Sequence, residues 1–266
     1  MVVDFHCHFW DLFSACSECL PEEGKSEEKC LEFFKSMLSR DCFYVNSFSG
    51  TEYRETISLL EKTSDFNIIP VFGIHPQNPE PSQMEILSGL IEKKMIYGIG
   101  ECGFDMFTPE YASTLENQKM VWDFQLDEAV KKQLPMIIHV RKALPLIFGH
   151  IPDLKKVPAV IFHGWPGSPV EAESLLKKGV NAFFSFGKAL LQGRKNSLET
   201  LKFLPPERIL TETDFPFMTL KNQDFTRPVE IEKIKKFILD FKSLPESMFE
   251  EILLENCCNI FGLKGV

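Results

Sequence analysis

The chain has 266 residues, of which 44% are hydrophobic and 25% charged, and its formal net charge is −9. This ordinary globular composition argues against extended disorder, and no stretch approaches the roughly 18 uninterrupted apolar residues that a membrane span requires. The acidic balance argues against a broad basic surface for nucleic acid, although a bound cation would not enter this sum. The first residues lack a basic segment followed by an apolar one, so we expect a cytoplasmic protein whose eight cysteines are free thiols.

Apolar runs typical of β-strands recur along the chain. They lie at 2–9, 42–48, 67–76, 95–105, 135–140, 159–164, 181–187 and 208–214. Segments of helical periodicity lie between most of them, at 28–40, 51–62, 82–94, 118–133 and 169–179. Strands that are apolar on both faces and alternate with helices form a parallel sheet. Eight such units predict an α/β fold, a (β/α)8 TIM-type barrel that occupies residues 1–266 as a single domain.

An open doubly wound sheet is the alternative fold, but no G-x-G-x-x-G motif opens any helix, which removes the main support for its dinucleotide-binding form. The acidic stretch 16–30 is interpreted as a loop that leads into the first helix. Its cysteines, with Cys42, invite a zinc site, but the spacing is not that of two C-x-x-C pairs, and a thiol that opens an apolar strand is usually buried.

Polar side chains end six of the eight predicted strands. They are His6, His8, His75, Glu101, His139, His163 and Asp214, and they include five of the six histidines in the chain. One such histidine alone would most often be a hydrogen-bonded core residue, but independent core histidines have no reason to gather at the same end of successive strands. The active site of a (β/α)8 barrel lies at this end.

Two histidines that lie two residues apart on a strand point to the same face, so His6 and His8 suit one divalent cation. Adding Glu101, His139, His163 and Asp214 gives six nitrogen and carboxylate ligands, too many for one catalytic ion that also holds water. We therefore expect two divalent ions with Glu101 as the bridge. Without thiolate ligands the pattern admits Mg, Mn or Zn.

Several short motifs resemble those of the TatD family of metal-dependent deoxyribonucleases within the amidohydrolase superfamily. They are D-F-H-C-H-F at 4–9, G-I-H-P at 73–76, G-I-G-E-C-G-F-D at 98–105, H-V-R at 139–141, H-G-W-P-G-S at 163–168, E-T-D-F-P at 212–216 and N-C-C-N-I-F-G at 256–262. The resemblance implies a TIM-type barrel that hydrolyses phosphodiesters, with DNA as substrate. The chain departs from the family pattern after His163 and near 225–228, where substrate would be contacted.

The resemblance also implies roles for single residues. One ion would be held by His6, His8, Glu101 and Asp214, and the other by Glu101, His139 and His163. His75 would lie near the phosphate, and Arg141 would be a guanidinium partner in the substrate pocket.

The expected chemistry is attack by a water whose pKa the ions lower, with Asp214 as general base. Glu212 lies two residues before Asp214 and is a candidate to orient a ligating histidine or simply to pack in a polar layer. Trp10 and Trp165 follow ligand positions, so we expect both at the pocket mouth, where a ring stacks on a nucleobase.

Two other functions are considered. An amidohydrolase acting on a small amide, ester or lactone would use the same ions, although no lysine stands at the bridging position. A non-catalytic binding barrel would have no physical reason to keep six metal-binding side chains in a costly cluster.

Overall fold

The structure is a computed structural model, and it describes residues 1–19, 26–50 and 52–263. All eight predicted strands are confirmed. They are β1 (Val2–Cys7), β2 (Cys42–Phe48), β3 (Asn67–Phe72), β4 (Gly98–Asp105), β5 (Met136–Arg141), β6 (Val160–Phe162), β7 (Ala182–Phe186) and β8 (Ile209–Thr211). They pair in parallel in the order in which they occur along the chain.

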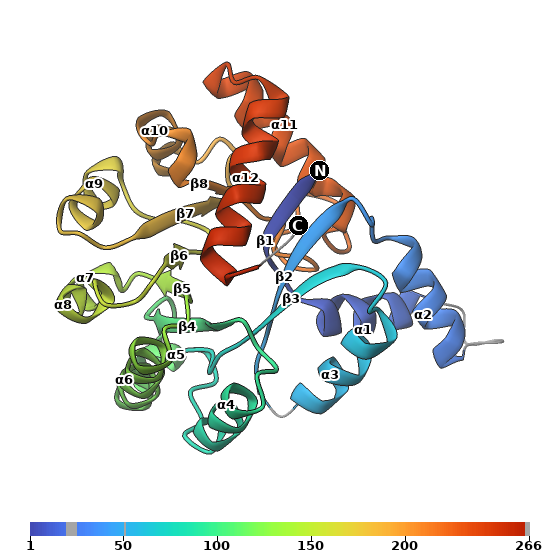
Figure 1. Cartoon of the computed structure of the whole chain (residues 1–266), viewed down its shortest axis with the longest axis horizontal. Helices are drawn as coiled ribbons and strands as arrows, with labels where there is room; N and C mark the ends of the chain where they lie inside the picture. Colours follow the sequence, from blue (N-terminus) through green and yellow to red (C-terminus); the bar gives the residue numbers. More distant parts are fainter. Residues whose placement is uncertain (20–25, 51, 264–266) are drawn as a thin grey trace.

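Helices surround the strands, as Figure 1 shows. They are α1 (Phe9–Cys19), α2 (Glu27–Ser36), α3 (Tyr53–Lys62), α4 (Gln83–Glu92), α5 (Pro109–Ser113), α6 (Leu115–Lys132), α7 (Leu144–Gly149), α8 (Ile151–Leu154), α9 (Pro169–Lys177), α10 (Lys195–Phe203), α11 (Ile231–Lys242) and α12 (Glu246–Phe261). Short 3-10 turns occur at Pro206–Arg208 and Pro228–Glu230. Among the described residues, no helix combines the length and apolarity needed to cross a membrane.

The barrel closes where β8 meets β1. The backbone amide of Asp214 donates to the carbonyl of His6 at 2.9 Å, and the Thr211 hydroxyl donates to the carbonyl of Val3 at 2.6 Å. The predicted (β/α)8 TIM-type barrel is therefore confirmed, because the sheet runs from β1 to β8 and these bonds bring its two edges together.

Two strands carry one residue more than their neighbours. Between Asp4 and Cys7 β1 has an extra residue relative to β2, and between Ile99 and Cys102 β4 has one relative to β5. Such β-bulges change the face to which the following side chains point, and they are frequent beside active sites. Here the bulged segments are those that carry His6 and Glu101.

Glycine residues allow β4 to lie close to β5 around the bulge in β4. A Cβ atom built on Gly100 would lie 2.7 Å from the Cβ of Ile137, and one on Gly103 would lie 2.0 Å from the carbonyl oxygen of His139. No side chain fits at either distance, so only glycine permits this path of the backbone around Glu101.

The prediction of a loop over 16–30 is wrong at both of its ends. Residues 16–19 belong to α1 and residues 27–30 belong to α2, while 20–25 lie outside the described residues. Helix α1 buries Phe9, Leu12 and Cys16 in a cluster with Phe34 of α2. These buried apolar positions recur at helical spacing and outweigh the polar composition of the stretch.

Free thiols are confirmed for all eight cysteines. The considered zinc site is not formed, because none of the groups among the described residues that bring three ligand atoms together contains a cysteine.

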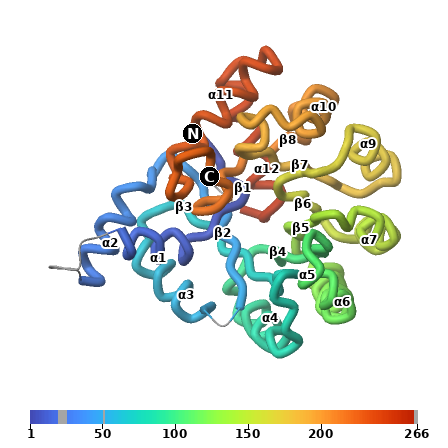
Figure 2. Tube along the Cα trace, turned by 180° about the vertical axis from the view of Figure 1, so that it is seen from behind, coloured from blue at the N-terminus to red at the C-terminus, as the bar shows by residue number. Residues whose placement is uncertain are grey.

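A buried lysine anchors the segment that connects β8 to α11. The Nζ atom of Lys188 lies 3.0 Å from Glu230 Oε2, 2.8 Å from the side-chain oxygen Oε1 of Gln223 and 2.7 Å from the Thr226 hydroxyl. Viewed from the other side in Figure 2, this segment lies beside the start of α1, and the amide of His8 donates to the carbonyl of Phe215 at 2.9 Å. Lys188 therefore fixes a segment that borders the end of β1.

Replacing Lys188 by Met should lower the free energy of unfolding by about 3–5 kcal/mol, because the buried carboxylate of Glu230 loses its charge partner. The measurement is urea denaturation, with Lys195→Met as control, since Lys195 forms an exposed pair with Glu199. The double variant Lys188→Met, Glu230→Gln should regain part of the loss. Equal stability of the Lys188→Met and Lys195→Met proteins would contradict this role.

Candidate metal centre

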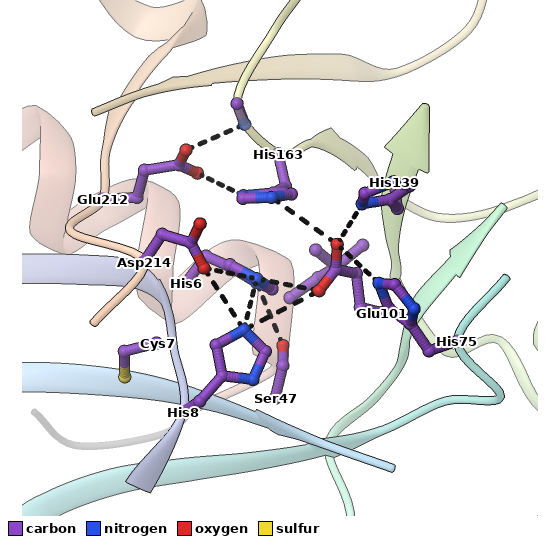
Figure 3. A network of polar contacts seen from close by, with 12 residues as sticks. His6, Cys7, His8, Ser47, His75, Glu101, His139, His163, Glu212 and Asp214 are labelled. Atoms are coloured by element: carbon purple, nitrogen blue, oxygen red, sulfur yellow. Dashed lines mark hydrogen bonds and ion pairs between the residues drawn. The ribbon is translucent and has the colours of Figure 1, made fainter. Parts of the chain in front are cut away.

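All seven polar side chains predicted at strand ends gather at one end of the barrel (Figure 3). His6 lies in β1 and His8 just beyond it, while Glu101 and His139 lie within β4 and β5. The other three, His75, His163 and Asp214, follow β3, β6 and β8 within three residues. Parallel strands in a closed barrel bring these positions together although they are up to 208 residues apart in the sequence.

Glu101 lies at the centre, and its two carboxylate oxygens face different histidines. Oε2 lies 3.1 Å from His6 Nε2 and 3.7 Å from His8 Nε2. Oε1 lies 2.6 Å from His139 Nδ1 and 3.5 Å from His163 Nε2. The carboxylate thus divides the site into two halves, with two imidazole nitrogens beside Oε2 and three beside Oε1, where His75 Nε2 lies 3.4 Å away.

Asp214 belongs to the half that contains His6 and His8. Its Oδ1 atom lies 3.3 Å from His8 Nε2 and 3.7 Å from His6 Nε2. The residue has a φ of +57°, in the left-handed region that aspartate tolerates better than most residues. Its neighbour Thr213 donates its amide to Oδ1 of the buried Asp4 side chain at 2.9 Å, which holds this backbone against β1.

Three of the histidines bind an outer side chain through the ring nitrogen that faces away from Glu101. His6 Nδ1 lies 3.1 Å from the Ser47 hydroxyl, His139 Nε2 lies 3.0 Å from Asp105, and His163 Nδ1 lies 3.2 Å from Glu212. The carboxylates of Asp105 and Glu212 accept a proton from the outer nitrogen of His139 and His163, which leaves the lone pair of the inner nitrogen free for a cation. The Ser47 hydroxyl can accept from His6 Nδ1 or donate to it. Glu212 therefore contacts a candidate ligand, which was one of its two predicted roles.

His75 differs from the other histidines in its hydrogen bonding. Its Nδ1 accepts the backbone amide of Gln77 at 3.1 Å, so in the neutral ring the proton resides on Nε2. This Nε2 lies 3.4 Å from Glu101 Oε1. A protonated nitrogen donates a hydrogen bond but cannot ligate a metal, which distinguishes His75 from the candidate ligands.

Charge and burial act against each other throughout the site. Burial disfavours the ionised form of Glu101, yet the surrounding imidazoles hold its pKa well below the usual value. Burial lowers the pKa of His163, but the carboxylates of Glu212, Glu101 and Asp214 outweigh it and raise that pKa to about 10. In the metal-free chain the His163 ring is thus a cation at neutral pH, so a metal ion would displace its proton.

Burial also disfavours the ionised form of Asp105, but the His139 ring, Gln77 and the amide of Phe107 lower its pKa to about 2. Deep burial of Asp4 has the opposite result and raises its pKa to about 8, despite the hydrogen bonds from Thr213.

The donor set fits divalent cations. Three groups bring their ligand atoms within 4.8 Å of one another, namely His6 with His8 and Glu101, His6 with His163 and Asp214, and His75 with Glu101 and His139. Imidazole nitrogens and carboxylate oxygens suit several first-row ions and magnesium. Glu101 belongs to two of these three groups, and the group of His6, His163 and Asp214 does not include it.

The prediction that Trp165 stands at the pocket mouth is wrong. Its side chain is only 1% exposed and packs edge-on against Phe162 and Phe184, with ring centroids 5.2 and 4.8 Å away. Gly167 makes this possible, because a Cβ atom there would lie 2.3 Å from the Trp165 ring. The W-P-G departure from the family pattern thus places an aromatic ring in the core.

Trp10 is half-buried on α1, where it stacks on Phe13 at 5.7 Å and lines a groove that also includes Leu31 and Leu59. Arg141 is partly exposed at the end of β5, and its Nη1 atom lies 3.8 Å from Asp105.

Sequence reasoning missed two polar side chains beside the site, Ser47 and Gln77. Ser47 contacts His6, and the Gln77 side chain donates to Asp105 at 2.8 Å. Both positions carried a signal, since Ser47 lies near the end of a predicted strand and Gln77 follows a strand-end histidine by two residues. A search for polar residues at the ends of predicted strands would have found both if it had included hydroxyl and amide side chains.

Comparison with known proteins gives consistent results. A family model described as TatD related DNase matches residues 3–262. The chain is 31% identical over 179 residues to the 3′-5′ ssDNA/RNA exonuclease TatD of Pantoea ananatis, covering 65% of this chain and 67% of that protein. It is 23% identical over 274 residues to YjjV of Escherichia coli, named an uncharacterized metal-dependent hydrolase, with 98% of each chain covered. The crystal structure of YjjV matches this fold with a TM-score of 0.79 at 22% identity over 98% of each chain.

Replacing Glu212 by Gln should weaken the affinity for a divalent ion about 10- to 100-fold, the usual effect of losing such an outer partner. The Gly164 amide donates to Glu212 Oε1 at 2.8 Å, so the glutamine oxygen should stay there and its amide group should donate to His163 Nδ1. That bond would move the ring proton to the inner nitrogen and block it as a ligand.

The measurement is calorimetric titration of chelator-treated protein with manganese, with Glu116→Gln as control because Glu116 is exposed. Equal affinities of the Glu212→Gln and Glu116→Gln proteins would rule out this orienting role.

Proposed function

The chain belongs to the family of TatD-related DNases, and from this membership we propose that it is a metal-dependent nuclease that hydrolyses phosphodiester bonds of single-stranded DNA, exonuclease-like in action. A relative named as a 3′-5′ ssDNA/RNA exonuclease and another named as a metal-dependent hydrolase support this substrate and this chemistry. The proposal treats residues 1–266 as one hydrolase unit, because side chains as far apart in the sequence as His6 and Asp214 contribute to one site.

One observation carries the proposal of two ions, the division of the site by Glu101. One half offers His6, His8 and Asp214, and the other offers His139 and His163. A carboxylate with one oxygen toward each half is suited to bridge two cations. Mg, Mn and Zn all suit the ligand types, and sulfur ligands that would favour a softer ion contribute to none of the three candidate groups among the described residues.

The candidate ligands would hold divalent ions, which would lower the pKa of a water molecule and neutralise charge on the phosphoryl oxygens. Asp214 is our candidate general base. Burial raises its pKa, but His163, His8 and His6 outweigh burial and hold that pKa below the usual value, so the carboxylate is ionised at neutral pH. It can therefore accept a proton from the attacking water.

His75 and Arg141 are our candidates for substrate contacts. His75 carries its proton on Nε2, which faces the site and can donate to a phosphoryl oxygen. Arg141 lies two residues beyond His139 on β5 and offers a guanidinium group, which pairs well with phosphate. Trp165 was expected in this role as well, but its burial removes it from the proposal.

The purified protein should bind two divalent ions per chain, and a chelator should abolish its hydrolysis of a labelled single-stranded oligonucleotide. Readdition of Mg, Mn or Zn should restore turnover, which identifies the effective ion. The measurements are metal analysis after dialysis and the release of labelled nucleotides, with a small amide and a small lactone as comparison substrates. Chelator-resistant hydrolysis, or one ion at full occupancy in excess metal, would contradict the two-ion proposal.

Replacing Glu101 by Gln should release at least one ion and reduce turnover by several orders of magnitude while the fold survives. Glutamine keeps the size of the side chain but removes the charge that lets one carboxylate hold two mutually repelling cations. The measurements are metal stoichiometry, turnover and thermal midpoint, compared with Glu116→Gln on the surface. Retention of two ions with near-normal turnover would overturn the bridging role of Glu101.

A further inference from the structure

An aromatic side chain lies exposed beside the metal centre with two cations over its ring. Phe107 follows β4 and is 47% exposed. The guanidinium carbon of Arg141 lies 4.0 Å from its ring centroid, and Nζ of the exposed Lys142 lies 4.6 Å from it. We refer to these three residues as the Phe107 platform.

The platform is held in a fixed position relative to a candidate metal ligand. The amide of Phe107 donates to Asp105 Oδ1 at 2.8 Å, while Oδ2 of the same carboxylate lies 3.0 Å from His139 Nε2. Arg141 Nη1 lies 3.8 Å from this Oδ2 atom. One buried carboxylate thus connects the exposed ring, the guanidinium group and the imidazole.

The chemistry of the platform matches a nucleotide. Aromatic rings and planar guanidinium groups both stack on nucleobases, whatever the base, and an ammonium group pairs with phosphate. In a chain of net charge −9, two cations gathered at the rim of a site provide local attraction for an anionic strand.

We propose that the Phe107 platform binds a nucleotide of a single-stranded substrate next to the bond that is cleaved. The base stacks on the Phe107–Arg141 surface, and Lys142 contacts a neighbouring phosphate. This inference rests on the proposed nuclease function and adds the element that selects a polynucleotide over a small phosphodiester.

A second exposed aromatic residue, Phe217, lies on the opposite side of the barrel, beyond β8. Its ring meets the edge of the His8 ring at a centroid distance of 5.2 Å. A change at Phe217 would therefore disturb a candidate metal ligand directly, whereas the Phe107 ring contacts cations of the rim. Phe107 is the cleaner position for a test.

The experiment combines Phe107→Ala with oligonucleotides that lack a single base. We expect Phe107→Ala to weaken binding of a labelled single-stranded oligonucleotide about 5- to 100-fold, the range of stacking positions. At one position, an abasic nucleotide should weaken wild-type binding by a similar factor and should cause no further loss in the variant. Phe107→Trp should restore binding, and Phe203→Ala, an exposed residue at the end of α10, should leave it unchanged.

Binding is measured by fluorescence anisotropy with a chelator present, so that the DNA stays intact, and kcat/KM is measured with metal. The ratio of kcat/KM for the oligonucleotide to that for bis(4-nitrophenyl) phosphate should fall in Phe107→Ala and stay constant in Phe203→Ala. Unchanged binding in Phe107→Ala would overturn the inference. So would a result in which each abasic oligonucleotide weakens binding to Phe107→Ala by the same factor as binding to the wild-type protein, whatever the position of the missing base.

The two proposals fail in different ways. A wild-type protein that binds the oligonucleotide through Phe107 but cleaves neither substrate contradicts the nuclease function and retains the platform. Cleavage that is insensitive to Phe107→Ala retains the nuclease function and rejects the platform. A protein that neither binds nor cleaves the oligonucleotide overturns both.

Discussion

The architecture of the site depends on one buried negative charge. In the part of the chain that the structure describes, five histidines have a ring nitrogen within 3.7 Å of the Glu101 carboxylate, and the pKa of Glu101 is held well below the usual value although burial opposes ionisation. A carboxylate in such surroundings requires positive charge nearby. In the metal-free chain that charge is a proton on imidazole, above all on His163, and in the proposed enzyme it is a pair of cations. Metal binding and proton release are therefore linked, so the affinity for metal should rise with pH across the titration of the rings.

Closure of the barrel and assembly of the site are the same event. His6 and Asp214 come from opposite ends of the sheet order and meet through the bond from the Asp214 amide to the His6 carbonyl. Asp4 reinforces this seam by accepting the amide of Thr213 beneath it. Because these partners are more than 200 residues apart in sequence, forming the seam carries a large loop-closure entropy. The candidate ligands before β2 and after β8 thus lie close together only when all eight strands have paired.

The strands, their order and the clustering of histidines at strand ends could be predicted from the sequence. Apolar runs are a local property of the sequence, and the parallel topology follows from a general rule for alternating strands and helices. Features that depend on pairing or packing between distant segments could not be predicted from the sequence. The extra residues in β1 and β4 are visible only when each strand is set against its partner. Trp165 was assigned to the rim because it follows a ligand, but its ring turns inward over Gly167, a contact that no periodicity reveals. The acidic residues of the stretch 16–30 led to the prediction of a loop, although its described ends belong to two helices with buried apolar residues.

The irregular strands have a consequence for any attempt to idealise this barrel. Deleting one residue between Asp4 and Cys7, or between Ile99 and Cys102, would give uninterrupted ladders with β2 and β5. The residues available for deletion, however, are Phe5 and His6 in β1 and Gly100 and Glu101 in β4. Either choice would remove the candidate ligand itself or change the bulged backbone that directs its side chain. Optimising the regularity of the sheet would thus produce a better-paired scaffold without a catalytic centre. The proposed chemistry of this molecule therefore depends on the two β-bulges in β1 and β4. Substitutions designed to raise stability should leave both bulges unchanged.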